Sequence, residues 1–283
     1  MSTFYNQATL SYNDNVINSN VVTGELVEVL SAAKTSLTED YRVGDRVTYT
    51  ISIVNSGTAA LNGLTVTDDL GTYPFGIRTL TPLTYATGSV KYFQNGVLQT
   101  GVGVNEGPPL VFSGINVPAG GNVVLVYEAL VNSYAPPSAG STITNNAVIT
   151  GAGITEVRVT DTITAASGAS LIISKSMCPE SVVENGQLVY TFVIQNTGNT
   201  AAVTTDNVQV TDQFNPILNP ITVTYNAQPW TAPANYTYSD ETGLFQTVPG
   251  QITVPSASYV QDDETGQWTV TPGVSVLKVS GIV

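Results

Sequence analysis

Two sets of chemically matched residues recur along this chain, each made of a lysine, an aspartate and an asparagine. The first set is Lys34, Asp68 and Asn145, and the second is Lys175, Asp212 and Asn6. At an exposed site the lysine and aspartate form an ion pair of small net value, and the asparagine serves a turn. At a buried site, desolvation lowers the pKa of the lysine and raises that of the aspartate, so the neutral amine becomes a nucleophile. The sequence leaves both alternatives open.

Composition argues against most other chemistry. The chain has no histidine, so neither a Ser-His-Asp or Cys-His arrangement nor a histidine-bearing metal site is available. No glycine-rich phosphate loop appears, and nothing among the 21 acidic residues singles out a glycosidase pair. The net charge of −13, with eight basic residues, argues against nucleic acid or an anionic membrane as a partner. We therefore predict no enzymatic activity and no cofactor.

Two acidic runs are the only candidates for a metal site. Asp68-Asp69 and Asp262-Asp263-Glu264 offer oxygen ligands of the kind that calcium prefers. Neither run fits the twelve-residue calcium loop, and solvated turns are the favoured interpretation of both. We predict no metal.

An internal repeat sets the positions of the two residue sets. The stretch AAKTSLTEDYRVGDRVTYTISIVNSGTAA matches IISKSMCPESVVENGQLVYTFVIQNTGNTAA, with Lys34 and Lys175 separated by 141 residues. After a three-residue insertion the match resumes, with Val-Thr-Asp ending at Asp68 and at Asp212. A late stretch at 117–131 matches 271–283. Each repeat therefore carries the same lysine and aspartate on corresponding elements.

Alternation of apolar and polar residues indicates strands. In Arg46–Ile53 the apolar members Val47, Tyr49, Ile51 and Ile53 fall on one face, as a half-buried strand requires. Several such strands, separated by Gly, Pro and Asn turns and without a helical period, are typical of a β-sandwich. We predict an all-β fold of two tandem Ig-like β-sandwich domains preceded by an N-terminal donor β-hairpin.

The repeats differ after their late strand. The first continues through SYAPPSAGST into ITNNAVITGAGITEVRVTDTITA, a hairpin that completes its sandwich, whereas the second stops at Val283. Asn6-Gln7-Ala8-Thr9-Leu10 aligns with Asn145-Asn146-Ala147-Val148-Ile149 of that hairpin. We expect residues 1–27 to be a donor segment, 28–166 a complete repeat and 167–283 a repeat that lacks its closing hairpin.

The donor segment is expected to close the second repeat of another copy. The connection Glu28–Ala33 spans at most about 20 Å, too short for a return past a whole domain. Donation between copies is head-to-tail and gives an open filament. An ordered or frayed arm is the alternative. The residues expected to dock are Phe4, Asn6, Ala8, Leu10, Val21 and Val22.

The paired signatures resemble a known family. They are a lysine, a turn at Gly44-Asp45 or Asn185-Gly186, Tyr-Thr within an alternating strand, Asn-x-Gly, Val-Thr-Asp, and Asn-x-Ala in the closing hairpin. This order is similar to the prokaryotic surface-repeat family called domain of unknown function eleven. The resemblance implies Ig-like modules at a cell surface, and some members resemble subunits of ribbon-like appendages on bacterial endospores. Two repeats without a sorting motif suit a small, pilus-like polymer subunit better than a wall-anchored protein.

The lysine, aspartate and asparagine set resembles the intramolecular isopeptide sites of Gram-positive pilins and adhesins. There a carboxylic acid assists attack of a neutral lysine amine on an asparagine amide, with release of ammonia. The resemblance implies a bond between Lys34 and Asn145 assisted by Asp68, and one between Lys175 and Asn6 of another copy assisted by Asp212. A salt bridge with a turn asparagine remains the alternative.

Other residues add partners and alternatives. Cys178 is the single cysteine, so it is either a buried apolar residue, which its alignment with Leu37 favours, or an intersubunit thiol. Tyr49, Tyr190, Trp230 and Trp268 suit core or interface positions. The expected partners are further copies and an anchoring protein, with no membrane span, at an extracellular cell or spore surface. The alternative function is a monomeric adhesin that presents region 213–270.

Overall fold

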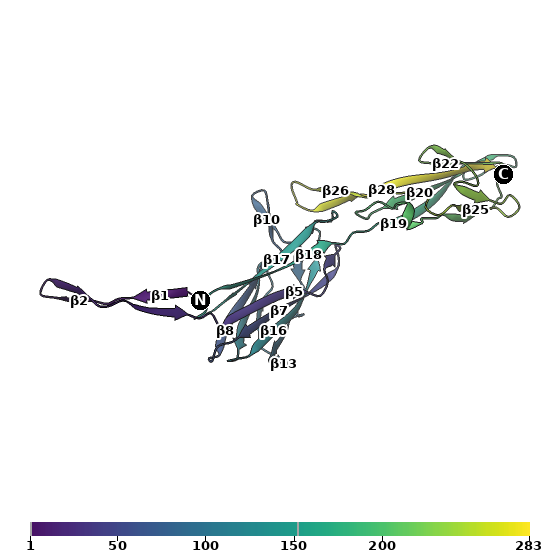
Figure 1. Cartoon of the computed structure of the whole chain (residues 1–283). Helices are drawn as coiled ribbons and strands as arrows, with labels where there is room; N and C mark the ends of the chain where they lie inside the picture. Colours follow the sequence, from purple (N-terminus) through teal and green to yellow (C-terminus); the bar gives the residue numbers. More distant parts are fainter. Residues whose placement is uncertain (1, 152) are drawn as a thin grey trace. The chain divides into compact units, whose positions relative to one another are not determined.

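The computed structural model describes residues 2–151 and 153–283, and its contacts divide the chain into two compact units. Unit 1 comprises residues 1–132 and 143–163, and unit 2 comprises 133–142 and 164–283. Figure 1 shows strands throughout both units, and the one helical turn described is η1 (Thr204–Asp206). The prediction of an all-β fold with two sandwiches is confirmed. The boundaries at 27 and 166 stay predictions.

The first sheet of unit 1 forms because its central strands alternate. In β7 (Arg46–Asn55) the residues Val47, Tyr49, Ile51 and Ile53 are all buried. The late strand β16 (Asn122–Val131) pairs with β7 antiparallel, placing Tyr127 opposite Tyr49. The strand order is β13 (Val97–Gln99), β12 (Lys91–Gln94), β16, β7, β5 (Leu30–Ser36), and β11 (Leu83–Tyr85) also pairs with β16.

The second sheet of unit 1 contains the closing hairpin. Strand β17 (Thr142–Thr150) pairs antiparallel with β8 (Leu61–Asp68), with Ala147 opposite Asp68. The order is β14 (Gly103–Asn105), β15 (Leu110–Val117), β8, β17, β18 (Val157–Ala165), β6 (Asp40–Tyr41). A separate ribbon joins β9 (Tyr73–Phe75) to β10 (Arg78–Leu80). The hairpin predicted to complete the first sandwich is present.

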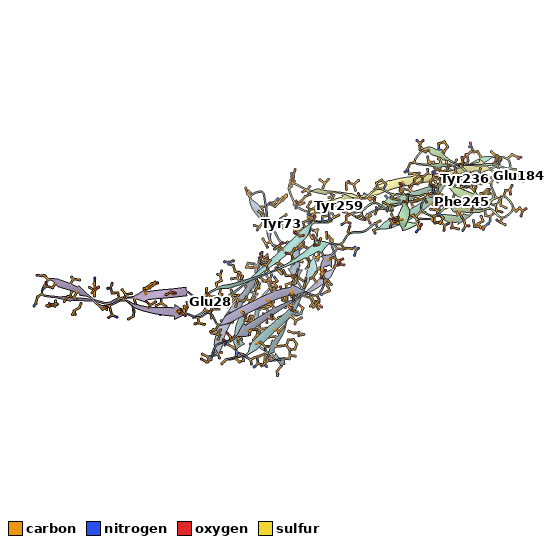
Figure 2. All side chains as sticks on the ribbon, viewed as in Figure 1. Glu28, Tyr73, Glu184, Tyr236, Phe245 and Tyr259 are labelled. Carbon is orange, nitrogen blue, oxygen red and sulfur yellow. The ribbon has the colours of Figure 1, made fainter. Side chains whose placement is uncertain are left out.

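Unit 2 repeats the first sheet and shortens the second. Its larger sheet has the order β19 (Leu171–Cys178), β20 (Gln187–Asn196), β28 (Gly273–Ile282), β22 (Ile221–Tyr225), β23 (Gln228–Trp230). Its smaller sheet has the order β21 (Thr211–Gln213), β25 (Leu244–Thr247), β24 (Tyr236–Tyr238). Tyr236 and Phe245, labelled in Figure 2, pack with ring centroids 5.4 Å apart. A ribbon of β26 (Ser258–Gln261) and β27 (Trp268–Thr271) completes the unit.

The N-terminal segment forms two short ribbons that end near Glu28, which Figure 2 labels. Strand β1 (Ser2–Asn6) pairs with β4 (Val22–Leu26), and β2 (Thr9–Tyr12) pairs with β3 (Asn15–Asn18). Gly24 allows this pairing, because a Cβ atom there would lie 2.3 Å from Cζ of Phe4. Among the described residues, no helix is long and apolar enough to cross a membrane.

Candidate functional site

The first lysine and aspartate meet inside the sandwich of unit 1. Lys34 occupies an inward-facing position of β5, and Asp68 ends β8 in the opposite sheet. The Lys34 Nζ lies 2.7 Å from Asp68 Oδ2, and both side chains are 0% exposed. The other carboxylate oxygen, Oδ1, accepts a hydrogen bond of 2.9 Å from the Leu70 backbone N–H. The pair is therefore a buried one, unlike the solvated ion pair that a turn would carry.

Two tyrosines border this pair. The Tyr127 hydroxyl donates a hydrogen bond to Asp68 Oδ2, and its ring stacks on Tyr49 with centroids 5.6 Å apart. Burial raises the pKa of the Tyr127 hydroxyl well above its usual value, so this group remains a protonated donor. Burial also lowers the pKa of Lys34, an effect that the charge of Asp68 opposes. The site thus favours a neutral amine more than water does.

Asn145 is the third buried member. It lies on β17 with 0% exposure, and neither Nδ2 nor Oδ1 has a hydrogen-bond partner among the described residues. The hydroxyls of Tyr49 and Tyr127 lie near this amide without reaching standard hydrogen-bond geometry. An unsatisfied buried amide costs about 1–3 kcal/mol and calls for an explanation.

A second contact fixes the strand that carries Asn145. The next residue, Asn146, donates from its backbone N–H to Asp69 Oδ1 at 2.9 Å and from Nδ2 to Asp69 Oδ2 at 2.8 Å. The Asp69 backbone N–H donates in return to the Asn146 carbonyl at 2.9 Å. Asn146 Oδ1 accepts a bond of 2.8 Å from the hydroxyl of Thr160 on β18. We call the Asp69–Asn146 contact the register clamp.

Unit 2 contains the same lysine and aspartate in an open setting. Lys175 on β19 forms an ion pair with Asp212 on β21, and these side chains are 40% and 17% exposed. Lys175 Nζ also lies 4.4 Å from the centroid of Tyr190, the counterpart of Tyr49. Opposite Tyr190 on β28 stands Val279, where unit 1 has Tyr127. The tyrosine donor of unit 1 is therefore missing from the second pair.

One edge of the smaller sheet in unit 2 is free. Strand β21 pairs with β25 alone among the described residues, whereas β8 lies between β15 and β17. All eight residues of β19 are exposed, including Leu171, Ile173 and Met177, which share a face with Lys175. An unpaired strand edge beside an uncovered apolar face is a ready template for another strand.

Asn6 and the expected donor residues are exposed in the described chain. Asn6 ends β1 opposite Val22 of β4. The apolar members of the segment are all exposed: Phe4 at 55%, Leu10 at 63%, Val21 at 52% and Val22 at 54%. Ala8 is exposed as well. The structure thus buries Lys34, Asp68 and Asn145 in unit 1, pairs Lys175 with Asp212 in unit 2, and leaves the residues that we expect to dock exposed.

The remaining predictions have mixed outcomes. The buried role favoured for Cys178 is wrong, because Cys178 is exposed on β19 and its aligned residue, Leu37, is itself 69% exposed. Asp262 forms the expected turn, with Oδ1 accepting bonds from the backbone N–H groups of Glu264 and Thr265. The described residues contain no cluster of three acidic, cysteine or histidine side chains that could hold a metal.

The aromatic residues mostly occupy the expected packing positions. Tyr49 and Tyr190 are buried in their sandwiches, and Trp230 packs on Tyr225 with centroids 4.7 Å apart. Sequence reasoning missed Tyr127 and the register clamp. The clamp had a visible signal, since Asp69 and Asn146 each follow a member of the first set directly.

Comparisons with known proteins give distant structural matches only. No family model and no curated protein matches the chain. The BcpA variant D312A, a major pilin subunit of Bacillus cereus, shares 13% identity at a TM-score of 0.38, covering 95% of this chain and 73% of that one. The pilus backbone RrgB of Streptococcus pneumoniae shares 11% identity at 0.35, covering 86% and 55%.

A third match is the collagen adhesin of Staphylococcus aureus, with 12% identity, a TM-score of 0.32 and 55% coverage of each chain. These scores are too low to support an argument about this chain. The functional conclusion therefore rests on the residues and contacts described above, and the resemblance to domain of unknown function eleven stays a prediction.

Proposed function

We propose that this chain is a structural subunit of an extracellular fibre that polymerises head-to-tail. The observation that carries the proposal is the contrast between a buried Lys34–Asp68–Asn145 set and an open Lys175–Asp212 pair beside a free strand edge. The segment around Asn6 has the sequence that the open edge requires. Addition of this segment from a second copy would cover the pair and supply its asparagine.

The register of the added strand follows from unit 1. There Ala147 lies opposite Asp68 and Ile149 opposite Val66. The same register in unit 2 places Ala8 opposite Asp212 and Leu10 opposite Val210. Asn6 then takes the position that Asn145 holds beside Lys34. The paired strands would satisfy backbone groups of β21 that the described chain leaves without a strand partner.

The chemistry proposed for each set is isopeptide bond formation. Asp68 accepts a proton from the Lys34 ammonium, and the neutral Nζ attacks Cγ of Asn145. The new bond is Nζ–Cγ and the Cγ–Nδ2 bond breaks. Nδ2 takes the proton of the acid and leaves as ammonia, and the Asp68 carboxylate takes the second proton that the amine loses. Lys175, Asp212 and Asn6 of the second copy would follow the same steps. No oxidant, metal or cofactor is required.

Intact mass, electron microscopy and denaturing electrophoresis of the same preparation test this function. Wild-type protein is expected to form filaments that resist boiling in detergent and to lose about 17 Da per bond, the mass of ammonia. Tandem mass spectrometry should find branched peptides joining Lys34 to Asn145 and Lys175 to Asn6.

Two variants sharpen this test. Asn6→Ala should abolish the Lys175 branch and the detergent resistance while keeping the Lys34 branch, and deletion of residues 2–27 should abolish filaments. Asn20→Ala is the matched control, because Asn20 is exposed in the same segment but lies outside the docking register. Detergent-resistant filaments from Asn6→Ala would contradict the covalent joint. Dispersed wild-type monomers would favour a monomeric adhesin.

A further inference from the structure

The register clamp of unit 1 positions the reacting asparagine. Asp69 receives both N–H donors of Asn146, at 2.9 and 2.8 Å, and also accepts a bond of 2.8 Å from the Gly71 backbone N–H. Successive residues of a strand point to opposite faces, so a slip by one residue would turn Asn145 out of the sandwich. A contact made by the neighbouring residue on the outer face prevents that slip without entering the site.

Positions equivalent to Asp69 and Asn146 exist at the joint that we propose between copies. In unit 2 the residue after Asp212 is Gln213, which stands where Asp69 stands in unit 1. In the donor segment the residue after Asn6 is Gln7, which stands where Asn146 stands. Both glutamines are exposed in the described chain, where Gln213 Nε2 donates to the Thr242 carbonyl and Gln7 Nε2 donates to the Ser19 carbonyl at 2.7 Å. Each side chain keeps its carbonyl oxygen and a second N–H for a further contact.

We propose that Gln213 and Gln7 of a second copy form the register clamp of the intersubunit joint, and that this clamp holds Asn6 against Lys175. The inference rests on the proposed function. Each glutamine amide has two N–H donors and one carbonyl acceptor, so the two side chains can exchange hydrogen bonds. The intersubunit clamp is uncharged, whereas the register clamp of unit 1 contains the carboxylate of Asp69.

Substitution of Gln213 and Gln7 tests the proposed clamp, because both are positioning residues and touch no reacting atom. Q213D should keep or raise the initial rate of detergent-resistant oligomer formation, since it recreates the carboxylate–amide pair of domain 1. Q7D should stay within about threefold of wild type, because Gln213 still offers donors. Q7D/Q213D places two carboxylates together and should slow the bond at least about tenfold.

A rescue variant and a charge control complete the experiment. Q7K/Q213D pairs opposite charges and should return the rate to within about threefold of wild type. N20D/Q213D carries the same two added charges as Q7D/Q213D but leaves Gln7 in place, and should behave like Q213D. Loss of ammonia at Lys34–Asn145 is measured in every variant and should not change, which shows that each chain folds.

The outcomes separate the clamp from the proposed function. Rates for Q7D/Q213D that equal the product of the two single effects, or a failure of Q7K to rescue, would overturn the clamp while leaving the Lys175–Asn6 bond established. Absence of that bond from wild-type protein would overturn the proposed function and the clamp together. A non-additive loss with rescue by opposite charge supports the clamp.

Discussion

The two units carry the same lysine–aspartate pair, but the pair is buried in unit 1 and partly exposed in unit 2. In unit 1 the strands β17 and β18 complete the second sheet, and the side chains of Lys34 and Asp68 are 0% exposed. In unit 2 the strand β21 pairs with β25 on one side and with no described strand on the other, and the side chain of Lys175 is 40% exposed. The lysine and aspartate are the same residue types in both units, but only in unit 1 do described strands, β17 and β18, extend the second sheet beyond the aspartate's strand. Under the proposed function, a closing strand would supply both the asparagine and the burial that the reaction requires.

The largest expected effect is a difference in lysine reactivity. An amine-directed acylating reagent should modify Lys175 in unassembled protein and leave Lys34 untouched, because Lys34 is buried and Lys175 is open. After assembly Lys175 should become protected. Lys91 and Lys278 are exposed and serve as references in the same digest. Equal modification of Lys34 and Lys175 before assembly would remove the basis of the comparison.

Loss of the proposed Lys34–Asn145 bond in unit 1 should lower the free energy of unfolding by a large amount without preventing folding. Asn145→Ala keeps the Lys34–Asp68 pair and prevents a cross-link that closes a loop of about 110 residues. A cross-link of that loop length contributes about 5 kcal/mol on the chain-entropy estimate. We expect the melting temperature of domain 1 to fall by about 10–20 °C in calorimetry. Asn62→Ala, at an exposed position of β8, is the control.

Removal of the Tyr127 hydroxyl, which has no equivalent beside Asp212 in unit 2, should have a smaller effect on stability. In the Asn145→Ala background, Tyr127→Phe removes the hydroxyl that donates to Asp68 and should lower the free energy of unfolding by about 1.5–3 kcal/mol. Urea titration measures the change. Tyr12→Phe, at an exposed position, should change stability by less than about 0.5 kcal/mol. An unchanged Tyr127→Phe variant would show that this hydrogen bond is not a stabilising one.

The smallest expected difference between the two units is in how much folding stability each loses at alkaline pH. Burial raises the pKa of Tyr41 to about 12 and raises the pKa values of Tyr49 and Tyr127 well above their usual range, so these hydroxyls stay protonated in folded unit 1. Unfolded tyrosine releases its proton near pH 10. Folding stability should therefore decrease as pH rises above about 10, by up to about 1.4 kcal/mol per pH unit for each such tyrosine.

Domain-resolved hydrogen exchange at pH 9, 10 and 11 measures that loss. Unit 2 also contains tyrosines whose pKa burial raises, Tyr190 among them, but in the part of the chain that the structure describes none of their hydroxyls bonds to Asp212. Tyr41→Phe should reduce the slope for domain 1 alone. A steeper alkaline loss in domain 2 would contradict the more complete burial assigned to domain 1.

Period-two alternation predicted strands such as β7 because inward residues like Tyr49 and Ile51 must be apolar there. The repeat offset predicted Lys34 and Lys175 at matching places. It could not predict their different burial, which depends on strands far away in the chain. The same offset misled for Cys178, because alignment with an apolar residue does not establish burial when that residue, Leu37, is itself exposed. Tyr127 was missed because its partner Asp68 lies in the opposite sheet.

The place of Asn145 near the end of unit 1 has a mechanical consequence. Lys34 belongs to the first strand of the sandwich, and Asn145 belongs to its penultimate large strand. With the proposed bond in place, tension that enters at β5 would pass directly to β17 and on toward β19. Residues 35–144 would then carry no tension. A stretched fibre would lengthen only through the short segments between its proposed isopeptide bonds.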